Sequence, residues 1–350
     1  MAGIPIVDFA KASGGTQEEK KEIAGQIDDA FRRVGFVYLK NHGVPDDQVE
    51  ACFGWVSQQL GARTSIDSQT ITHTQQSKKF FELSFETKML APHPPGGSHH
   101  RGYSAPGVEK VSQHEYDANE ISKLRDIPDF KESFESGNVD DDAQPNIWLV
   151  EERLPGFRTF MESYFNLCAD LVHRILSSLS IALEVPEPGL SSTHSKSLFQ
   201  LRLLHYPAIA SEELAQNKRS RINAHSDFGT LTLLFQDSVG GLEVEDPHKR
   251  GTFRGAEPIE GTVLVNIGDL MARWSNDRWR STVHRVGIPP SNVDGVVNDR
   301  YSIPFFAVAN MDTVIEALPG CFDEVNNPKQ YEPVTAWGYV QMRMKALYET

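Results

Sequence analysis

Two histidines and one aspartate stand out in this sequence as side chains that could share a chemical task. His225 and Asp227 are two residues apart, and His284 follows much later in the chain. If the first segment is extended, residues i and i+2 point to the same side, so His225 and Asp227 could reach one ion. Two imidazoles and a carboxylate on one face of Fe(II) leave the opposite face open for oxygen chemistry. A closed zinc site would more often have a fourth protein ligand, and none is evident nearby.

Each of these residues also has a purely structural interpretation. An HxD tripeptide occurs often by chance, and a lone histidine such as His284 is more often a hydrogen-bonded structural residue. Arg300 and Ser302 follow His284 and add a guanidinium and a hydroxyl that could hold an acidic co-substrate. The metal interpretation therefore depends on whether the surrounding elements bring these side chains together.

The sequence changes character at residues 189–195, which we interpret as a hinge. Before it, the spacing of apolar residues predicts helices separated by polar segments. The expected helices are 17–34, 45–60, 74–81 and 155–183, with short strands at 4–9 and 36–39. The segment 92–108, dense in Pro, Gly and His, is expected to be a loop, and residues 126–145 are polar and acidic.

Beyond the hinge, short alternating segments separated by turn residues predict strands. The expected strands are 198–204, 231–235, 242–244, 263–267, 281–283 and 301–306. Strands at this spacing favour an all-β sandwich or jelly roll. Residues 334–348 return to a helical pattern and predict a C-terminal helix.

Composition narrows the class of protein. A chain of 350 residues with 39% hydrophobic residues has enough apolar material for a large core. The net charge of -14 argues against a general binder of nucleic acid or of anionic membranes. Three widely spaced cysteines give no disulfide framework, which favours a reducing compartment, and we expect the cytoplasm. We see no signal peptide and no apolar stretch long enough to span a membrane.

Longer motifs flank the candidate residues over nearly the whole chain. They are HSDFGTLTLLFQDSVGGLEV at 225–244, VNIGDLMARWSNDRWRSTVHRV at 265–286, RYSIPFF at 300–306, IPIVDF at 4–9, GFVYLKNHGVP at 35–45, FFELSFETK at 80–88 and HRGYSAPGVEKV at 100–111. In this order they resemble the Fe(II)- and 2-oxoglutarate-dependent oxygenases of the isopenicillin N synthase-like superfamily. The sequences of these motifs are most similar to those of fungal biosynthetic members.

The strand pattern and the resemblance together predict a mainly β fold with flanking helices. Its core is expected to be a double-stranded β-helix, or jelly roll, with an N-terminal helical region and a C-terminal helix. The expected divisions are an N-terminal dioxygenase region at 1–150, a long helix and hinge at 151–197, the oxygenase core at 198–310 and a C-terminal segment at 311–350. We expect these parts to form one compact unit.

The resemblance also implies a role for individual residues. His225, Asp227 and His284 match the iron ligands of the family. Arg300 and Ser302 match the motif that holds the distal carboxylate of 2-oxoglutarate, and Tyr206 matches a tyrosine that often contacts the same molecule. Many relatives have an asparagine at the position of Leu204, so one polar contact to 2-oxoglutarate is expected to be missing or replaced.

The implied activity is that of a dioxygenase that uses Fe(II), 2-oxoglutarate and O2. Such enzymes convert 2-oxoglutarate to succinate and oxidise an unactivated C–H bond of a small molecule, by hydroxylation, desaturation or ring closure, and we expect a role in natural-product biosynthesis. One alternative is an oxidase of the isopenicillin N synthase or aminocyclopropane-carboxylate oxidase type, in which the Arg and Ser bind another acid. A second alternative is a jelly-roll binding module without catalysis.

Four residues are candidates for contact with the substrate. They are Arg101, Tyr103, Arg202 and Phe305, in segments that would line the pocket together with the C-terminal helix. The two arginines suggest an acidic group on the substrate. Each of the four is equally well explained as an ordinary loop or core residue.

Overall fold

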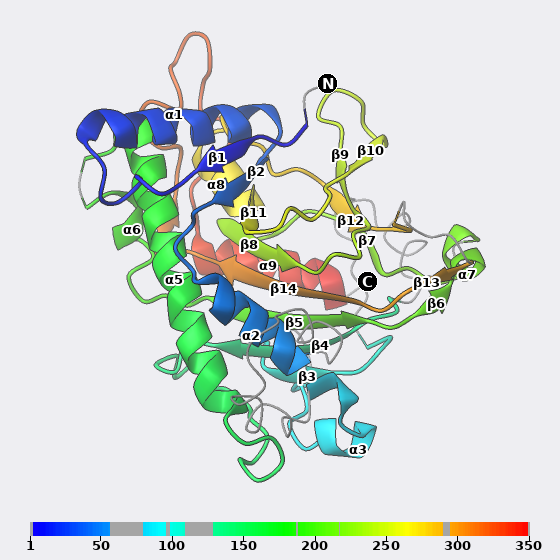
Figure 1. The fold of residues 1–350 in the computed structure, drawn as a ribbon. Helices are drawn as coiled ribbons and strands as arrows, with labels where there is room; N and C mark the ends of the chain where they lie inside the picture. The colour runs from blue at the N-terminus through cyan, green and yellow to red at the C-terminus, as the bar shows by residue number, and fades with distance from the viewer. Residues whose placement is uncertain are drawn as a thin grey trace.

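The computed structural model describes residues 3–56, 80–95, 99–108, 129–186, 188–216, 218–289 and 295–348. Two β-sheets face each other, and long helices cover the outer side of the larger sheet (Figure 1). This arrangement confirms the prediction of a jelly-roll core with helices at both ends of the chain.

The large sheet has eight strands in the described part of the chain, and they come from both halves of the sequence. In spatial order they are β1 (Ile6–Asp8), β2 (Phe36–Lys40), β11 (Thr262–Ile267), β8 (Leu231–Gln236), β14 (Arg300–Ala307), β5 (Gln200–Tyr206), β4 (Glu132–Gly137) and β3 (Gly102–Ser104). The strands pair antiparallel except for β1 and β2, which are parallel.

The small sheet lies opposite and carries the residues of interest. Its strands, in spatial order, are β10 (Phe253–Gly255), β9 (Leu242–Glu245), β12 (His284–Val286) and β7 (Ile222–His225). Two strand pairs complete the described sheets: β13 (Val296–Val297) with β6 (Ile209–Ala210), and β15 (Val314–Ile315) with β16 (Val334–Thr335).

The two faces of the large sheet serve different purposes. Its outer face packs against α1 (Gln17–Arg33) and α5 (Phe157–Ala182) in the main hydrophobic core. Its inner face meets the small sheet in a second, smaller core, where Leu204 and Tyr206 pack near Val244. Because side chains alternate along a strand, neighbouring residues of one strand belong to different cores.

The helices begin and end close to where the sequence predicts. Thr16 caps α1, since its hydroxyl accepts a hydrogen bond from the Glu19 backbone while the Glu19 carboxylate accepts one from the Thr16 backbone. Gly35 follows with a φ of 77°, which favours glycine and ends the helix. The other described helices are α2 (Asp46–Val56), a 3-10 turn (Phe80–Glu82), α3 (Phe85–Lys88), α6 (Gly189–Ser192), α7 (Ser211–Ala215), α8 (Asp269–Trp274) and α9 (Ala336–Tyr348).

Some predictions of elements were wrong. The expected loop at 92–108 contains β3, and the acidic segment contains β4, so both lengthen the large sheet. The strand expected at 281–283 corresponds to β12, which begins only at His284; Ser281 forms an isolated bridge with Ile267, and the Ser281 and Thr282 hydroxyls donate hydrogen bonds to Asp269 and to the Val34 carbonyl. The expected hinge contains the short helix α6. The helix expected at 74–81 lies mostly outside the described residues.

The N-terminal region and the oxygenase core share one sheet. Strand β2 pairs with β11, and β4 pairs with β5, so the predicted divisions 1–150 and 198–310 are joined by backbone hydrogen bonds on both sides. We infer that they fold as one unit. Among the described helices, none is both long and apolar enough to cross a bilayer.

Candidate iron centre

The small sheet brings His225, Asp227 and His284 together. His225 is the last residue of β7, and it pairs across the sheet with His284, the first residue of β12. The centres of the two imidazole rings are 4.3 Å apart. Oδ1 of Asp227 lies 3.8 Å from Nε2 of His225 and 3.7 Å from Nε2 of His284. One nitrogen of each histidine and one carboxylate oxygen therefore converge within 4.8 Å of one another.

The remaining hydrogen bonds fix the orientation of both imidazoles. Nδ1 of His225 lies 2.8 Å from the Asn223 carbonyl oxygen, and Nδ1 of His284 lies 3.2 Å from that of Thr282. A carbonyl only accepts, so each Nδ1 carries a proton, and in a neutral imidazole Nε2 then keeps its lone pair. Ring nitrogens held in this way are typical of metal-binding histidines.

The two oxygens of the Asp227 carboxylate likewise have different surroundings. Its Oδ2 accepts hydrogen bonds from Thr232 Oγ1 at 2.6 Å and from Asn266 Nδ2 at 2.7 Å, which leaves Oδ1 facing the histidines. Burial alone would raise the pKa of Asp227, but the two histidines and these two donors lower it below its usual value. The group is therefore an ionised carboxylate.

The protonation states suit a divalent cation. Burial, and next the neighbouring His284, lower the pKa of His225 to about 3, so its imidazole is neutral at physiological pH. Neutral imidazole and ionised carboxylate are the forms that bind metal. Three such ligands with open positions suit Fe(II), and the geometry fits the ion that the sequence predicts.

A second set of contacts holds the segment that carries Asp227. The backbone N–H of Asp269, at the start of α8, donates to the Asp227 carbonyl at 2.7 Å. The carboxylate of Asp269 accepts hydrogen bonds from Ser226 Oγ at 3.1 Å and from Ser281 Oγ at 2.5 Å, and it forms a buried ion pair with Arg343 of α9. Sequence reasoning missed Asp269 and Arg343, because neither stands in a motif of metal-ligand spacing.

The predicted co-substrate residues lie together on the inner face of the large sheet. Arg300 pairs across the sheet with Tyr206, and its guanidinium carbon lies 5.0 Å from the centre of the Tyr206 ring. Its Nη1 donates to Ser302 Oγ at 3.1 Å. Arg300 is only 1% exposed. Leu204 lies directly opposite Ser302 and adds no polar atom to this cradle.

Of the four predicted substrate residues, Arg202 lies on this inner face. Its strand position alternates with Leu201 and Leu203, which belong to the outer core. Its guanidinium forms an ion pair with Glu135 at 2.7 Å and lies 5.7 Å from the centre of the Phe306 ring. Glu135 is fully buried, and its other oxygen accepts a hydrogen bond from Gln200.

The other three residues make their contacts elsewhere, and their role in substrate binding stays a prediction. Phe305 packs on the outer face, 5.1 Å from the ring of Phe165 in α5. Tyr103 also belongs to the outer core, and its hydroxyl donates to Glu132 at 2.5 Å. Arg101 is buried in an ion pair with Asp141 at 3.0 Å. The next residue, Phe306, shares the face of Ser302.

A second cluster of metal-ligand side chains lies beside Arg202. His93, His100 and Glu135 also have ligand-type atoms within 4.8 Å of one another. Both oxygens of Glu135 already accept hydrogen bonds, one from Arg202 and one from Gln200. The guanidinium of Arg202 neutralises this carboxylate, so we describe these residues as a hydrogen-bonded polar cluster and not as a metal centre.

Comparisons with known proteins agree with this geometry. The sequence profile of the 2OG-Fe(II) oxygenase superfamily matches residues 198–309, and the profile described as non-haem dioxygenase in morphine synthesis N-terminal matches residues 4–60 and 64–151. The proline hydroxylase buaE of Petromyces alliaceus is 37% identical over 99% of this chain and 98% of its own length. The 2-oxoglutarate-dependent dioxygenase frbA of Dothideomycetidae sp. is 36% identical, over 99% and 97%.

A solved structure gives the same result in three dimensions. A full-length protein of Neurospora crassa, crystallised with thymine and with alpha-KG, which is 2-oxoglutarate, superposes with a TM-score of 0.81 at 38% identity. The match covers 99% of this chain and 97% of that one. These relatives favour use of 2-oxoglutarate over the oxidase alternative and over a module without catalysis. The chain belongs to the 2OG-Fe(II) oxygenase superfamily, as a 2-oxoglutarate-dependent dioxygenase that uses Fe(II) and O2.

Proposed function

We propose that His225, Asp227 and His284 bind the Fe(II) of this dioxygenase. The observation that carries the proposal is the division of hydrogen bonds: each histidine Nδ1 and Asp227 Oδ2 are occupied, while the two Nε2 atoms and Oδ1 converge. A structural cluster would satisfy these three atoms with protein partners, whereas a metal site keeps their lone pairs available.

Arg300, Ser302 and Tyr206 are proposed to bind the distal carboxylate of 2-oxoglutarate. A guanidinium binds a carboxylate in a two-pronged manner, and the Ser302 hydroxyl, 3.1 Å from Arg300, adds a donor beside it. When bound, Fe(II) supplies the redox chemistry that couples decarboxylation of 2-oxoglutarate to oxidation of a C–H bond. The residues of the chain orient both molecules and keep water out of the interior between the sheets.

The substrate is a small molecule, and we propose that its polar end meets Arg202 and that Phe306 packs against it. The relatives include a proline hydroxylase and a protein crystallised with thymine, which supports a substrate of this size, and we propose a role in natural-product biosynthesis. The predicted acidic group on the substrate rested on Arg101 and Arg202, and the structure pairs both with carboxylates. A neutral amide, which both donates and accepts hydrogen bonds, suits the Arg202–Glu135 pair at least as well as a carboxylate does.

The iron assignment is tested by anaerobic Fe(II) titration of purified protein, monitored by calorimetry. We expect one site in the wild type and a loss of at least about 100-fold in affinity for His284→Ala, because a ligand is removed from a three-ligand set. The matched control is His248→Ala, which removes an exposed histidine on the loop between β9 and β10. Equal affinities in the two variants would refute the assignment.

The reaction itself is tested by measuring succinate formed from 2-oxoglutarate. Candidate substrates are added in two sets, one of amino acids and other carboxylates and one of neutral amides such as pyrimidine bases and cyclic dipeptides. We expect succinate formation to rise with the set that contains the substrate and to stop in His284→Ala. Turnover of a substrate without any succinate would favour the oxidase alternative instead.

A further inference from the structure

A second buried arginine lies beside the co-substrate cradle. Arg221 directly precedes β7, the strand that ends at His225, and its side chain is fully buried. Its guanidinium carbon lies 5.9 Å from the centre of the Tyr206 ring, and that of Arg300 lies 5.0 Å from the same ring. Two guanidinium groups therefore share one aromatic ring in the interior.

The two arginines differ in how their N–H groups are used. Arg300 donates from Nε to the Gly240 carbonyl, from Nη1 to Ser302 and from Nη2 to Gln236. Arg221 donates from Nη2 to the Asn298 carbonyl, whereas its Nε and Nη1 are buried and have no acceptor among the described residues. Buried polar groups in folded proteins nearly always have a partner, so unused donors on a buried cation point to a ligand.

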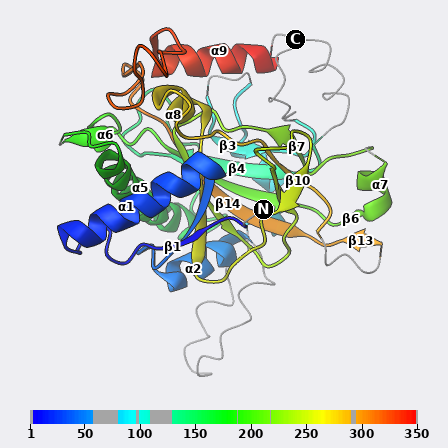
Figure 2. The ribbon, with the colours of Figure 1, turned by 90° about the horizontal axis from the view of Figure 1, so that it is seen from above.

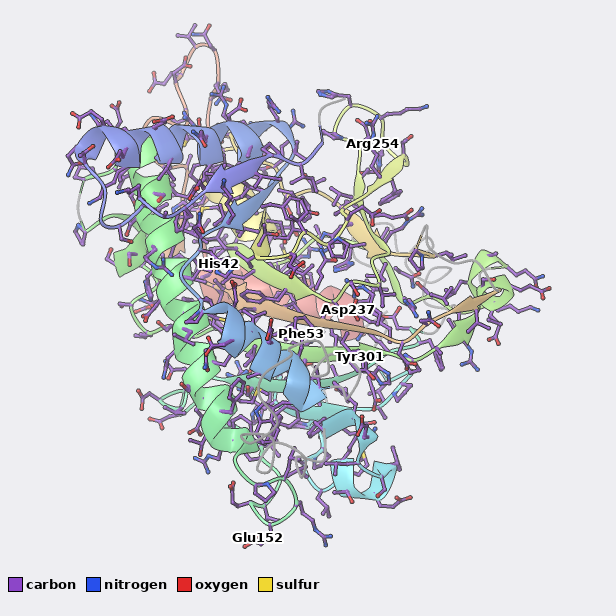
Figure 3. The ribbon with its side chains drawn as sticks, viewed as in Figure 1. His42, Phe53, Glu152, Asp237, Arg254 and Tyr301 are labelled. Atoms are coloured by element: carbon purple, nitrogen blue, oxygen red, sulfur yellow. The ribbon has the colours of Figure 1, made fainter. Side chains whose placement is uncertain are left out.

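The local charge leads to the same conclusion. A buried carboxylate near both arginines is Asp237, which Figure 3 labels, and its oxygens accept hydrogen bonds from the backbone N–H groups of Val239 and Tyr301. The half-buried carboxylate of Asp299 also acts on Arg221. Burial, and next the positive charge of Arg300, lower the pKa of Arg221 to about 10. An additional anion here would relieve their repulsion.

We propose that Arg221 is a second cationic contact for the acidic co-substrate, acting beside Arg300 on its distal carboxylate. The inference rests on the proposed function, in which 2-oxoglutarate occupies this cradle. It also answers the question raised by Leu204, which lies opposite Ser302 and has no polar atom. The donor that the family resemblance led us to expect at position 204 is supplied here from the segment before β7, and the site prefers a five-carbon 2-oxo diacid over a monoacid.

The test compares two acids of the same chain length by anaerobic calorimetry on the Fe(II)-loaded protein. One is 2-oxoglutarate, and the other is 2-oxopentanoate, which lacks the distal carboxylate and is measured directly or by competition. We expect Arg221→Gln to bind 2-oxoglutarate about 10- to 100-fold more weakly, the range for one hydrogen bond between charged groups, and to bind 2-oxopentanoate as the wild type does. Arg221→Lys keeps the positive charge and should lose less affinity for 2-oxoglutarate.

Two further variants separate the possible outcomes. Arg278→Gln, which breaks a distant ion pair with Asp28, is the matched control and should bind both acids normally. Arg300→Gln should weaken binding of 2-oxoglutarate whether or not Arg221 takes part. If Arg221→Gln binds both acids normally, or loses both equally, the role proposed for Arg221 is wrong although the proposed function stands. If the wild type itself does not bind 2-oxoglutarate, the proposed function fails.

Thermal unfolding of each variant precedes the titrations, so that a folding defect is not read as a binding defect. Should Arg221→Gln fail to fold, Arg221→Lys carries the same comparison. An ammonium group reaches a carboxylate with a single point of contact, whereas the guanidinium offers a fork. A loss for 2-oxoglutarate without a loss for 2-oxopentanoate in this variant supports the proposal, and equal behaviour towards the two acids overturns it.

Discussion

Asn266 and Thr232 orient the carboxylate of Asp227, since both donate to the oxygen that faces away from the histidines. Asn266→Ala removes one of these donors and lets the carboxylate rotate. We expect Fe(II) affinity to fall about 10- to 100-fold, as is typical when a partner of a metal ligand is lost. Anaerobic Fe(II) titration measures this change, and Asn310→Ala, whose amide instead bonds Ser195, serves as control. An unchanged affinity in Asn266→Ala would show that Thr232 alone suffices.

At the scale of residues, the candidate metal ligands and the candidate co-substrate arginine could be predicted from the sequence, because their side chains are chemically distinctive. Histidine, aspartate and arginine at family spacing identified the triad and Arg300. Asn266 was missed, because an amide is common and only the register of β8 and β11 places it across from Thr232. The sequence also could not show that Phe305 packs on the outer face, because the side of a strand on which a residue lies depends on a register that the sequence does not specify.

Helix α9 reaches the iron site through one buried ion pair. Arg343 pairs with Asp269, and its guanidinium carbon lies 4.4 Å from the centre of the Phe228 ring, next to Asp227 (Figure 2 shows α9 alongside α8). We expect Arg343→Met to lower the free energy of unfolding by roughly 3–5 kcal/mol, because it leaves Asp269 as an uncompensated buried charge. Urea denaturation measures the loss.

Two further variants make this expectation specific. Adding Asp269→Asn to Arg343→Met should recover part of the stability, since the stranded charge is then removed. Lys329→Met breaks the exposed pair with Glu316 and should cost less than about 1 kcal/mol. If the losses in Arg343→Met and Lys329→Met are similar, the Arg343–Asp269 pair does not anchor α9.

At the scale of elements, periodicity predicted the long helices and most strands of the core, because their apolar faces repeat regularly. It missed β4, whose six residues are all buried although two are glutamates. Those carboxylates are compensated by Lys88 and Arg202, which come from distant segments. A strand whose burial depends on such partners has no apolar signature of its own.

The stability of the whole molecule should depend on pH through His194. Its nitrogens bond Thr230 Oγ1 at 2.9 Å and the Leu190 carbonyl at 3.0 Å, and burial lowers its pKa from 6.5 to about 4. Because the folded value lies below the unfolded one, the unfolded state takes up the proton first. The contribution of His194 is therefore complete above about pH 6.5 and is lost as the pH falls towards 4.

We expect His194→Gln to flatten this dependence. Between pH 7 and pH 4.5 the wild type should lose on the order of 2 kcal/mol more unfolding free energy than the variant does. Urea denaturation at each pH, with a chelator present to exclude iron binding, measures the difference; the titration of the iron ligands is common to wild type and variant and cancels. His248→Gln, which changes an exposed histidine, should follow the wild type. Parallel curves for all three proteins would rule out His194 as the source.

The order of strands in the large sheet could not be predicted from the sequence. Strand β2 lies beside β11, and β14 lies between β8 and β5, although these segments are far apart in the chain. Such pairings are decided by long-range packing and not by local pattern. The spacing of the strands predicted an all-β sandwich or jelly roll, and the resemblance to the oxygenase family favoured the jelly roll.

The alternation along β14 has a consequence for how this enzyme could diversify. Ser302 and Phe306 lie on the inner face, where we propose that the co-substrate and substrate bind, whereas Ile303 and Phe305 belong to the main core, and Phe305 packs against Phe165 of α5. Substitutions at every second position of this stretch are therefore expected to affect catalysis, and substitutions at the positions between them are expected to affect folding. Descendants of the gene could acquire new substrates by changing one set while inheriting their stability from the other.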